Sequence, residues 1–169
     1  PLGTDSVTLS PYLGFESLRP ALDAATANQR GTFVLALTSN PEGKSVQHVG
    51  KAEDTGAVAK QVIAAATAEN TAQTWERMGS CGLVVGATVG EALKELAIDL
   101  STFNGPILSP GYGAQGASAE DLYRIFAGVE SQVLVNSSRG VLSAGPQPTD
   151  LARAAQSARD DLVRARGTS

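Results

Sequence analysis

The chain has 169 residues, of which 42% are hydrophobic and 18% charged, with a formal net charge of −4. These values indicate a single globular domain over residues 1–169, and the acidic balance with scattered Lys and Arg argues against nucleic-acid binding. No apolar run approaches the roughly 18 residues of a membrane span and the start lacks a secretory signal, so we expect a cytoplasmic protein with no membrane partner.

Five short apolar runs predict β-strands. Each run is nearly continuous rather than alternating, which is typical of parallel strands that are covered on both faces. In chain order the predicted strands are Val7–Leu9, Phe33–Leu37, Leu83–Val85, Pro106–Leu108 and Val133–Val135.

Residues with helical spacing follow each predicted strand. The first predicted helix carries Leu18, Leu22 and Ala25. The second runs from about Asp54 to Met78, with Trp75 and Met78 in its apolar face and Gly79 as its stop. The third covers Glu91–Ile98. The fourth is capped by Ser118, has Asp121 in its first turn and ends at Gly128, and the last starts near Thr149 with a stripe of Leu151, Ala155, Ala158 and Leu162.

This alternation of strands and helices predicts an α/β fold with a parallel sheet. A doubly wound sheet and part of a (β/α)8 TIM barrel are the alternatives. No Gly-x-Gly-x-x-Gly follows the first strand, which weakens a dinucleotide-binding interpretation. Glycine-rich loops instead follow the fourth and fifth strands, and barrels commonly bind phosphate after their last two strands. We therefore predict the C-terminal five units of a barrel, strands 4 to 8.

The loop after the fourth strand, in the segment ILSPGYGAQGAS, contains three glycines that let the main chain approach a ligand closely. Pro110 limits the strand exit, and the amide of Gln115 can both donate and accept hydrogen bonds. The helix that begins after Ser118 directs free N–H groups toward this loop. These features predict a grip for a phosphate and a neighbouring polar ring, with an ordinary flexible connection as the alternative.

Two other loops offer polar groups at the same end of the predicted sheet. Arg139 follows the last strand and has a planar fork of donors for phosphate oxygens, which the backbone N–H of Ser138 would supplement. Ser39, after the second strand, can hydrogen-bond an amide, although turn chemistry alone explains that loop. We interpret His48 as solvated and Cys81 as a small buried apolar residue, so no metal site is expected.

Taken together, the segments TLSPYLGFESL, LALTSNPEG, GLVVGAT, ILSPGYGAQGAS and VNSSRGVLSAG resemble the orotidine 5′-phosphate decarboxylases, most closely the bacterial subgroup common in actinobacteria. The resemblance covers essentially the whole chain. It implies a (β/α)8 barrel that works as a homodimer, needs no cofactor, and converts orotidine 5′-monophosphate to UMP and CO2. It also implies substrate-binding roles: Ser39 at the pyrimidine amide, Pro110 beside the ring, Gln115 between base and phosphate, and Ser138 and Arg139 at the phosphate.

The catalytic Asp-x-Lys-x-x-Asp motif of that family is absent from this chain. Its four lysines, at positions 44, 51, 60 and 94, are preceded two residues earlier by Glu, Val, Val and Ala. We therefore expect no catalytic residue here, and activity only when N-terminal barrel units supply that network. The alternatives are a non-catalytic phosphate-binding barrel fragment or assembly partner, and another phosphate-binding barrel enzyme that acts on sugar phosphates.

Overall fold

Five parallel strands form one sheet in a computed structural model that describes residues 3–50, 56–113 and 115–166. The strands lie side by side in chain order, which confirms all five sequence predictions: β1 (Ser6–Leu9), β2 (Gly31–Leu37), β3 (Cys81–Val85), β4 (Ile107–Pro110) and β5 (Val133–Asn136). The connecting helical segments are η1 (Phe15–Leu18), α1 (Arg19–Ala27), η2 (Pro41–Gly43), α2 (Lys44–Gln47), α3 (Val58–Thr71), α4 (Gly90–Glu95), α5 (Ala119–Ile125), η3 (Glu130–Gln132), α6 (Arg139–Leu142) and α7 (Pro148–Arg166).

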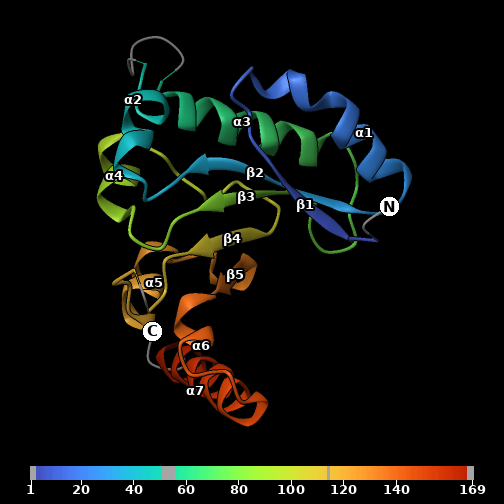
Figure 1. Cartoon of the computed structure of the whole chain (residues 1–169). Helices are drawn as coiled ribbons and strands as arrows, with labels where there is room; N and C mark the ends of the chain where they lie inside the picture. Colours follow the sequence, from blue (N-terminus) through green and yellow to red (C-terminus); the bar gives the residue numbers. More distant parts are fainter. Residues whose placement is uncertain (1–2, 51–55, 114, 167–169) are drawn as a thin grey trace.

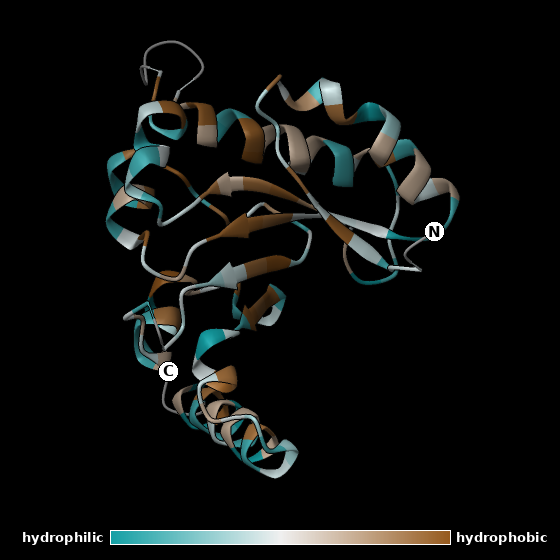
Figure 2. Cartoon of the chain, viewed as in Figure 1, coloured by the Kyte–Doolittle hydropathy of each residue, from teal (hydrophilic) through white to brown (hydrophobic). Residues whose placement is uncertain are grey.

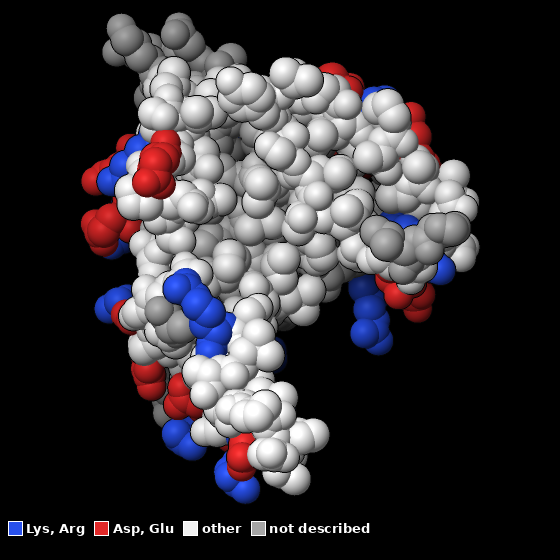
Figure 3. Space-filling view, viewed as in Figure 1, with Lys and Arg blue, Asp and Glu red and all other residues white. Residues whose placement is uncertain are grey.

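The sheet has one face packed against helices and one face that is partly open. The register aligns Val34 with Leu83, Leu83 with Ile107 and Ile107 with Val133, and this row belongs to the hydrophobic core. The adjacent row on the opposite face includes Leu108 and Leu134, and Leu134 is 51% exposed. The strands are strongly apolar in Figure 2, and charged side chains gather at the periphery of the molecule in Figure 3.

The molecule is an open crescent of five strand–helix units rather than a closed barrel. Figure 1 shows α1 and α3 over one end of the sheet and α6 and α7 beyond β5 at the other. Within the described residues, β1 pairs only with β2 and β5 only with β4. This arrangement is the predicted five-unit portion of a (β/α)8 barrel.

The second helix is shorter than predicted. Asp54 lies outside the described residues, α3 ends at Thr71, and Trp75 and Met78 lie in the turn beyond it. Met78 is exposed rather than part of the core, and the indole N–H of Trp75 donates to the carbonyl of Asn70 at 2.8 Å. The helix ends at Thr71, well before Gly79, so Gly79 is not its stop.

Gly79 instead provides space for Asn70. A Cβ atom at residue 79 would lie 2.0 Å from Asn70 Oδ1, which only glycine avoids. The predicted N-cap of α5 is confirmed, because Ser118 and Asp121 form a reciprocal capping box. In α7 the half-buried stripe includes Ala154, whereas the predicted Ala155 is exposed.

Cys81 is buried, as predicted, and burial raises the pKa of its thiol to about 11. His48 is half-buried at the end of α2. Over the described ranges, no helix is long and apolar enough to cross a membrane, and no cluster of His, Cys, Asp and Glu side chains has the arrangement of a metal site.

Candidate functional site

The carboxyl ends of the parallel strands lie at one edge of the sheet. The arrowheads of β2, β3 and β4 point to the same edge in Figure 1, beside α2, α4 and α5. The loop after each strand therefore begins near its neighbours, although the loops are far apart in the sequence. Ligands of open and closed parallel sheets bind at this edge.

The glycine-rich turn folds back over the end of β4. Gly111 has φ +119°, which side-chain-bearing residues rarely adopt, and the site of its absent Cβ lies 3.4 Å from Ala87 Cβ and 3.7 Å from Gln115 Oε1. The N–H of Ala87 donates to the carbonyl of Pro110 at 2.7 Å and ties the turn to the loop after β3. Glycine at residue 111 is thus favoured by its backbone conformation, whereas a Cβ there would make only ordinary van der Waals contacts with Ala87 and Gln115.

A cavity of about 80 Å³ lies between this turn and the loop after β5. Its lining includes four of the five predicted site residues; the full set is Pro110, Gly111, Tyr112, Gln115, Asn136, Ser137, Ser138 and Arg139. The fifth, Ser39, joins them because its hydroxyl donates to Gln115 Oε1 at 3.3 Å. The structure therefore brings all five residues together, and their roles toward a ligand remain predictions.

The charge at this cavity is positive. Arg139 is exposed at the start of α6, and no carboxylate in the described part of the chain lies within ion-pair distance of it. Ser138 precedes it as the N-cap of α6, where the first N–H groups of a helix have no partner within the helix. An unneutralised guanidinium beside free N–H groups is suited to an anion with several oxygens.

The size of the cavity restricts what it can hold. Sites for whole small molecules usually have volumes of roughly 300–1,000 Å³, so a cavity of about 80 Å³ fits one anionic group and not a nucleotide. Sequence reasoning missed Tyr112, Asn136 and Ser137 in the lining. These three residues are close in sequence to Gly111 and Ser138, so their position in the same two loops is the signal that could have found them.

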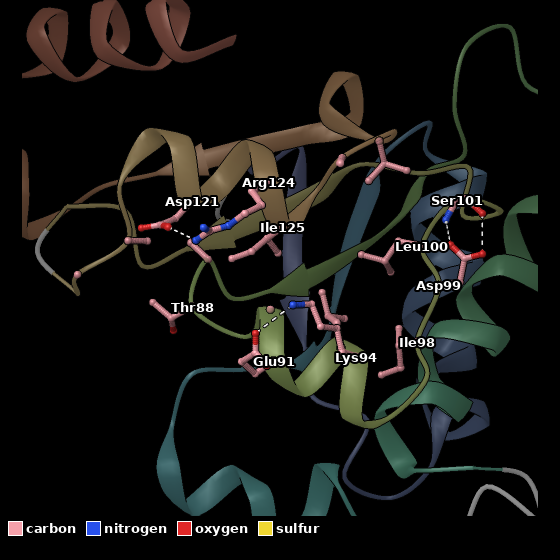
Figure 4. A pocket seen from close by; sticks show the side chains of 17 residues that line it. Thr88, Glu91, Lys94, Ile98, Asp99, Leu100, Ser101, Asp121, Arg124 and Ile125 are labelled. Atoms are coloured by element: carbon pink, nitrogen blue, oxygen red, sulfur yellow. Dashed lines mark hydrogen bonds and ion pairs between the residues drawn. The ribbon is translucent and has the colours of Figure 1, made fainter. Parts of the chain in front are cut away.

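A larger groove of about 610 Å³ lies between α4, α5 and the loop at residues 98–101 (Figure 4). Its cationic side chains are paired within their own elements. Lys94 pairs with Glu91 at 3.1 Å and Arg124 pairs with Asp121, whereas Asp99 accepts two hydrogen bonds from Ser101 that lower the pKa of its carboxyl group. The groove therefore presents no unpaired cation comparable to Arg139, and we place the candidate site at the carboxyl edge.

Comparison with known proteins identifies the family. The profile described as "Orotidine 5'-phosphate decarboxylase / HUMPS family" matches residues 1–155. The chain belongs to this family. Every residue of the candidate site falls within the matched range, whereas the last part of α7 lies beyond it.

Similar curated relatives within the orotidine 5′-phosphate decarboxylase / HUMPS family include actinobacterial proteins, in agreement with the resemblance seen in the sequence. The chain is 48% identical over 159 residues to an orotidine 5′-phosphate decarboxylase of Streptomyces coelicolor and 49% identical over 155 residues to one of Salinispora tropica. Each match covers 92% of this chain and 53% of the relative. The chain thus spans about half the length of the curated relatives it matches.

Solved structures of the same family confirm the fold. A crystal structure named as an orotidine 5′-phosphate decarboxylase from Streptomyces avermitilis matches with a TM-score of 0.86 and 46% identity, over 98% of this chain and 55% of that one. One named as an orotidine-monophosphate decarboxylase from Toxoplasma gondii matches with a TM-score of 0.74 and 28% identity, over 98% and 59%. The crescent is therefore the five-unit portion of the barrel of this family.

Proposed function

We propose that this chain forms the phosphate-binding part of an orotidine 5′-phosphate decarboxylase, which converts orotidine 5′-monophosphate to UMP and CO2. The supporting observation is the convergence of Gln115 and Arg139 on one small cavity from loops after neighbouring strands. The curated relatives that carry this name support the choice of reaction.

Each predicted residue has a role that its position supports. Arg139 and the N–H of Ser138 would hold the phosphate, for which the cavity has the right size and charge. Gln115 would bridge phosphate and base, because its carbonyl oxygen already accepts from Ser39 and its NH2 group can donate toward the cavity. Ser39 would face the pyrimidine amide and Pro110 would lie beside the ring.

Decarboxylation would require Asp and Lys side chains from barrel units that this chain does not contain, since no Asp-x-Lys occurs in the 169 residues. In the proposed reaction the carboxylates stress the substrate carboxylate, and the Lys stabilises and protonates the carbanion at C6. Such preorganised charges are usually a large catalytic contribution. Binding energy from the remote phosphate then organises the site. A cytoplasmic homodimer belongs to the same proposal.

The second candidate is a protein that binds phosphate through the same loops without catalysis, or that assembles with other barrel units. The absence of Asp-x-Lys from this chain favours it for the chain by itself. Combining the chain with a polypeptide that carries Asp-x-Lys-x-x-Asp and measuring UMP formation distinguishes the two. If no such combination forms UMP, the decarboxylase proposal is wrong.

In the complete enzyme we expect Arg139→Ala to raise the Michaelis constant for orotidine 5′-monophosphate by about 10- to 100-fold. Hydrogen bonds between charged groups each contribute about 1.5–3 kcal/mol, and the phosphate lies away from the reacting carbon. Arg153→Ala is the matched control, because Arg153 is exposed and pairs with Asp150 at 3.0 Å on α7. Equal Michaelis constants for both variants would reject the phosphate role of Arg139.

A further inference from the structure

The glycine-rich turn at residues 111–117 carries Gln115, yet it lies in neither a helix nor a strand. Among its described residues, Gly113 N–H donates to the carbonyl of Ala117 at 2.9 Å, Gly116 N–H to that of Gly113 at 2.8 Å, and Ala117 N–H to that of Gly111 at 3.3 Å. Gly111, Gly113 and Gly116 all have positive φ angles. Because glycine has unusual conformational freedom, such a turn needs external contacts to hold one shape.

Two side chains connect the turn to distant segments. The side-chain hydrogen bonds between distant segments include Ser39–Gln115 and Tyr112–Asp161, and both involve this turn. Gln115 bonds toward β2 and Tyr112 bonds toward α7, so the turn is held from both sides.

The contact of Tyr112 is well supported by packing. Its hydroxyl donates to Asp161 Oδ2 at 2.7 Å, and its half-buried ring packs against the hydrophobic core. The ring lines a cavity between α5, β5 and α7 together with Ala158 and Leu162, which flank Asp161 on the same face of α7. Tyr112 also lines the small cavity that contains Arg139. One side chain therefore touches both the anchoring helix and the candidate anion site.

The hydroxyl of Tyr112 stays protonated and can therefore donate to Asp161 at any neutral pH. Desolvation, together with the hydrogen bond and charge of Asp161, raises the pKa of Tyr112 to about 12, so its hydroxyl remains a donor throughout the neutral range. Asp161 lies beyond residue 155, where the family profile ends. The contact is thus made by a segment outside the matched region.

We propose that Tyr112 is a positioning residue whose hydroxyl, held by Asp161 of α7, fixes the glycine-rich turn so that Gln115 faces the anion cavity. This inference rests on the proposed function for the identity of the ligand. It assigns α7 a role in ligand binding although α7 contributes no residue to the small cavity.

The test compares four variants of the complete barrel protein. Tyr112→Phe and Asp161→Ala remove the contact, Asp161→Asn keeps an acceptor oxygen, and Asp160→Ala is the matched control on the exposed neighbour that pairs with Arg159. We expect the first two to raise the Kd for UMP and the Michaelis constant by about 3- to 10-fold with little change in kcat, because the lost hydrogen bond acts on the ligand only through the position of the turn. Asp161→Asn and Asp160→Ala should bind as the unmodified protein does.

The double variant Tyr112→Phe with Asp161→Ala should bind UMP no more weakly than Asp161→Ala alone, because Asp161→Ala already removes the hydrogen bond of Tyr112 together with the ion pair that Asp161 forms with Arg164 at 3.5 Å. Equal affinity of Tyr112→Phe and the unmodified protein, with thermal unfolding unchanged, would overturn the proposal. So would a loss in Asp161→Asn as large as in Asp161→Ala.

A measurement without nucleotide separates this proposal from the proposed function. Amide hydrogen exchange at residues 111–118 should be faster in Tyr112→Phe and Asp161→Ala than in Asp160→Ala. If UMP binds to no variant, the proposed function fails, and unchanged exchange would then overturn the positioning role independently. Faster exchange confined to this turn would support the contact as its anchor.

Discussion

At the scale of single residues, the side chain of Asn70 joins the end of α3 to the first residue of β3. Its Nδ2 donates to the carbonyl of Cys81 at 2.8 Å, and its Oδ1 accepts from the N–H of Cys81 at 3.1 Å. Asn70 is 1% exposed, and a Cβ atom at Gly79 or Gly105 would collide with its amide. Two glycines and one amide thus fix where β3 enters the sheet, and β3 leads to the loop that supports the glycine-rich turn.

We predict that Asn70→Ala lowers the free energy of unfolding of the complete protein by about 1–3 kcal/mol for each backbone group of Cys81 left without a partner. Urea denaturation measures the change. Asn104→Ala is the control, because that side chain is exposed, and it should change stability by less than about 0.5 kcal/mol. Equal effects of the two substitutions would contradict the role of Asn70.

Helix ends could be predicted from the sequence only where the residues that form them are close together in the chain. Ser118 and Asp121 are three positions apart and satisfy each other, so the start of α5 was predictable. The end of α3 was not, because the side chain of Asn70 near that end bonds to a residue eleven positions later, and no local pattern reveals this contact. A periodic apolar pattern that continued to Met78 therefore predicted a helix longer than the one that forms.

At the scale of elements, α7 is joined to the glycine-rich turn mainly through Tyr112. The charged groups that raise the pKa of Tyr112 are Asp161 on α7 and Glu120 on α5, while Arg159 and Arg166 line the same cavity. The unfolded chain would titrate this phenol near 10, its ordinary value. The folded value of about 12 means that the folded state retains the proton over this interval.

We predict that the stability contributed by this contact is fully present below pH 10 and is lost as the pH rises from about 10 to 12. The sign follows from linkage: the pKa is raised on folding, so unfolding releases a proton in that interval and alkaline conditions favour the unfolded state. Denaturation curves of the unmodified protein and Tyr112→Phe should converge toward pH 12. A difference between them that stays constant from pH 8 to 12 would contradict this assignment.

The topology of the sheet predicts that the loops of the site lie together, but it does not predict the contact between Tyr112 and Asp161. Parallel strands end at the same edge, so loops after β2, β4 and β5 had to lie near one another, and this placed Ser39, Gln115 and Arg139 together. The bond from Tyr112 to Asp161 depends on how α7 docks against α5, which no local pattern in the sequence specifies.

At the scale of the whole molecule, the sheet of this chain has two unpaired edges and one poorly covered face. β1 and β5 each pair with one strand among the described residues, and Leu134 on β5 is 51% exposed. Free edges and exposed apolar strands pair readily with other chains. In a closed barrel the remaining strands would cover both edges, so the same features become the surface on which the barrel is completed.

We predict that the isolated 169-residue chain self-associates, because its free edges present backbone donors and acceptors that a second chain can pair with. Sedimentation velocity at increasing concentration measures this. Leu134→Lys should reduce association by placing a charge on the open edge strand, whereas Val49→Lys, at an exposed position after α2, should leave it unchanged. A companion polypeptide with the remaining strands should replace self-association by a defined complex. A concentration-independent monomer with one cooperative thermal transition would show that the crescent is stable without barrel closure.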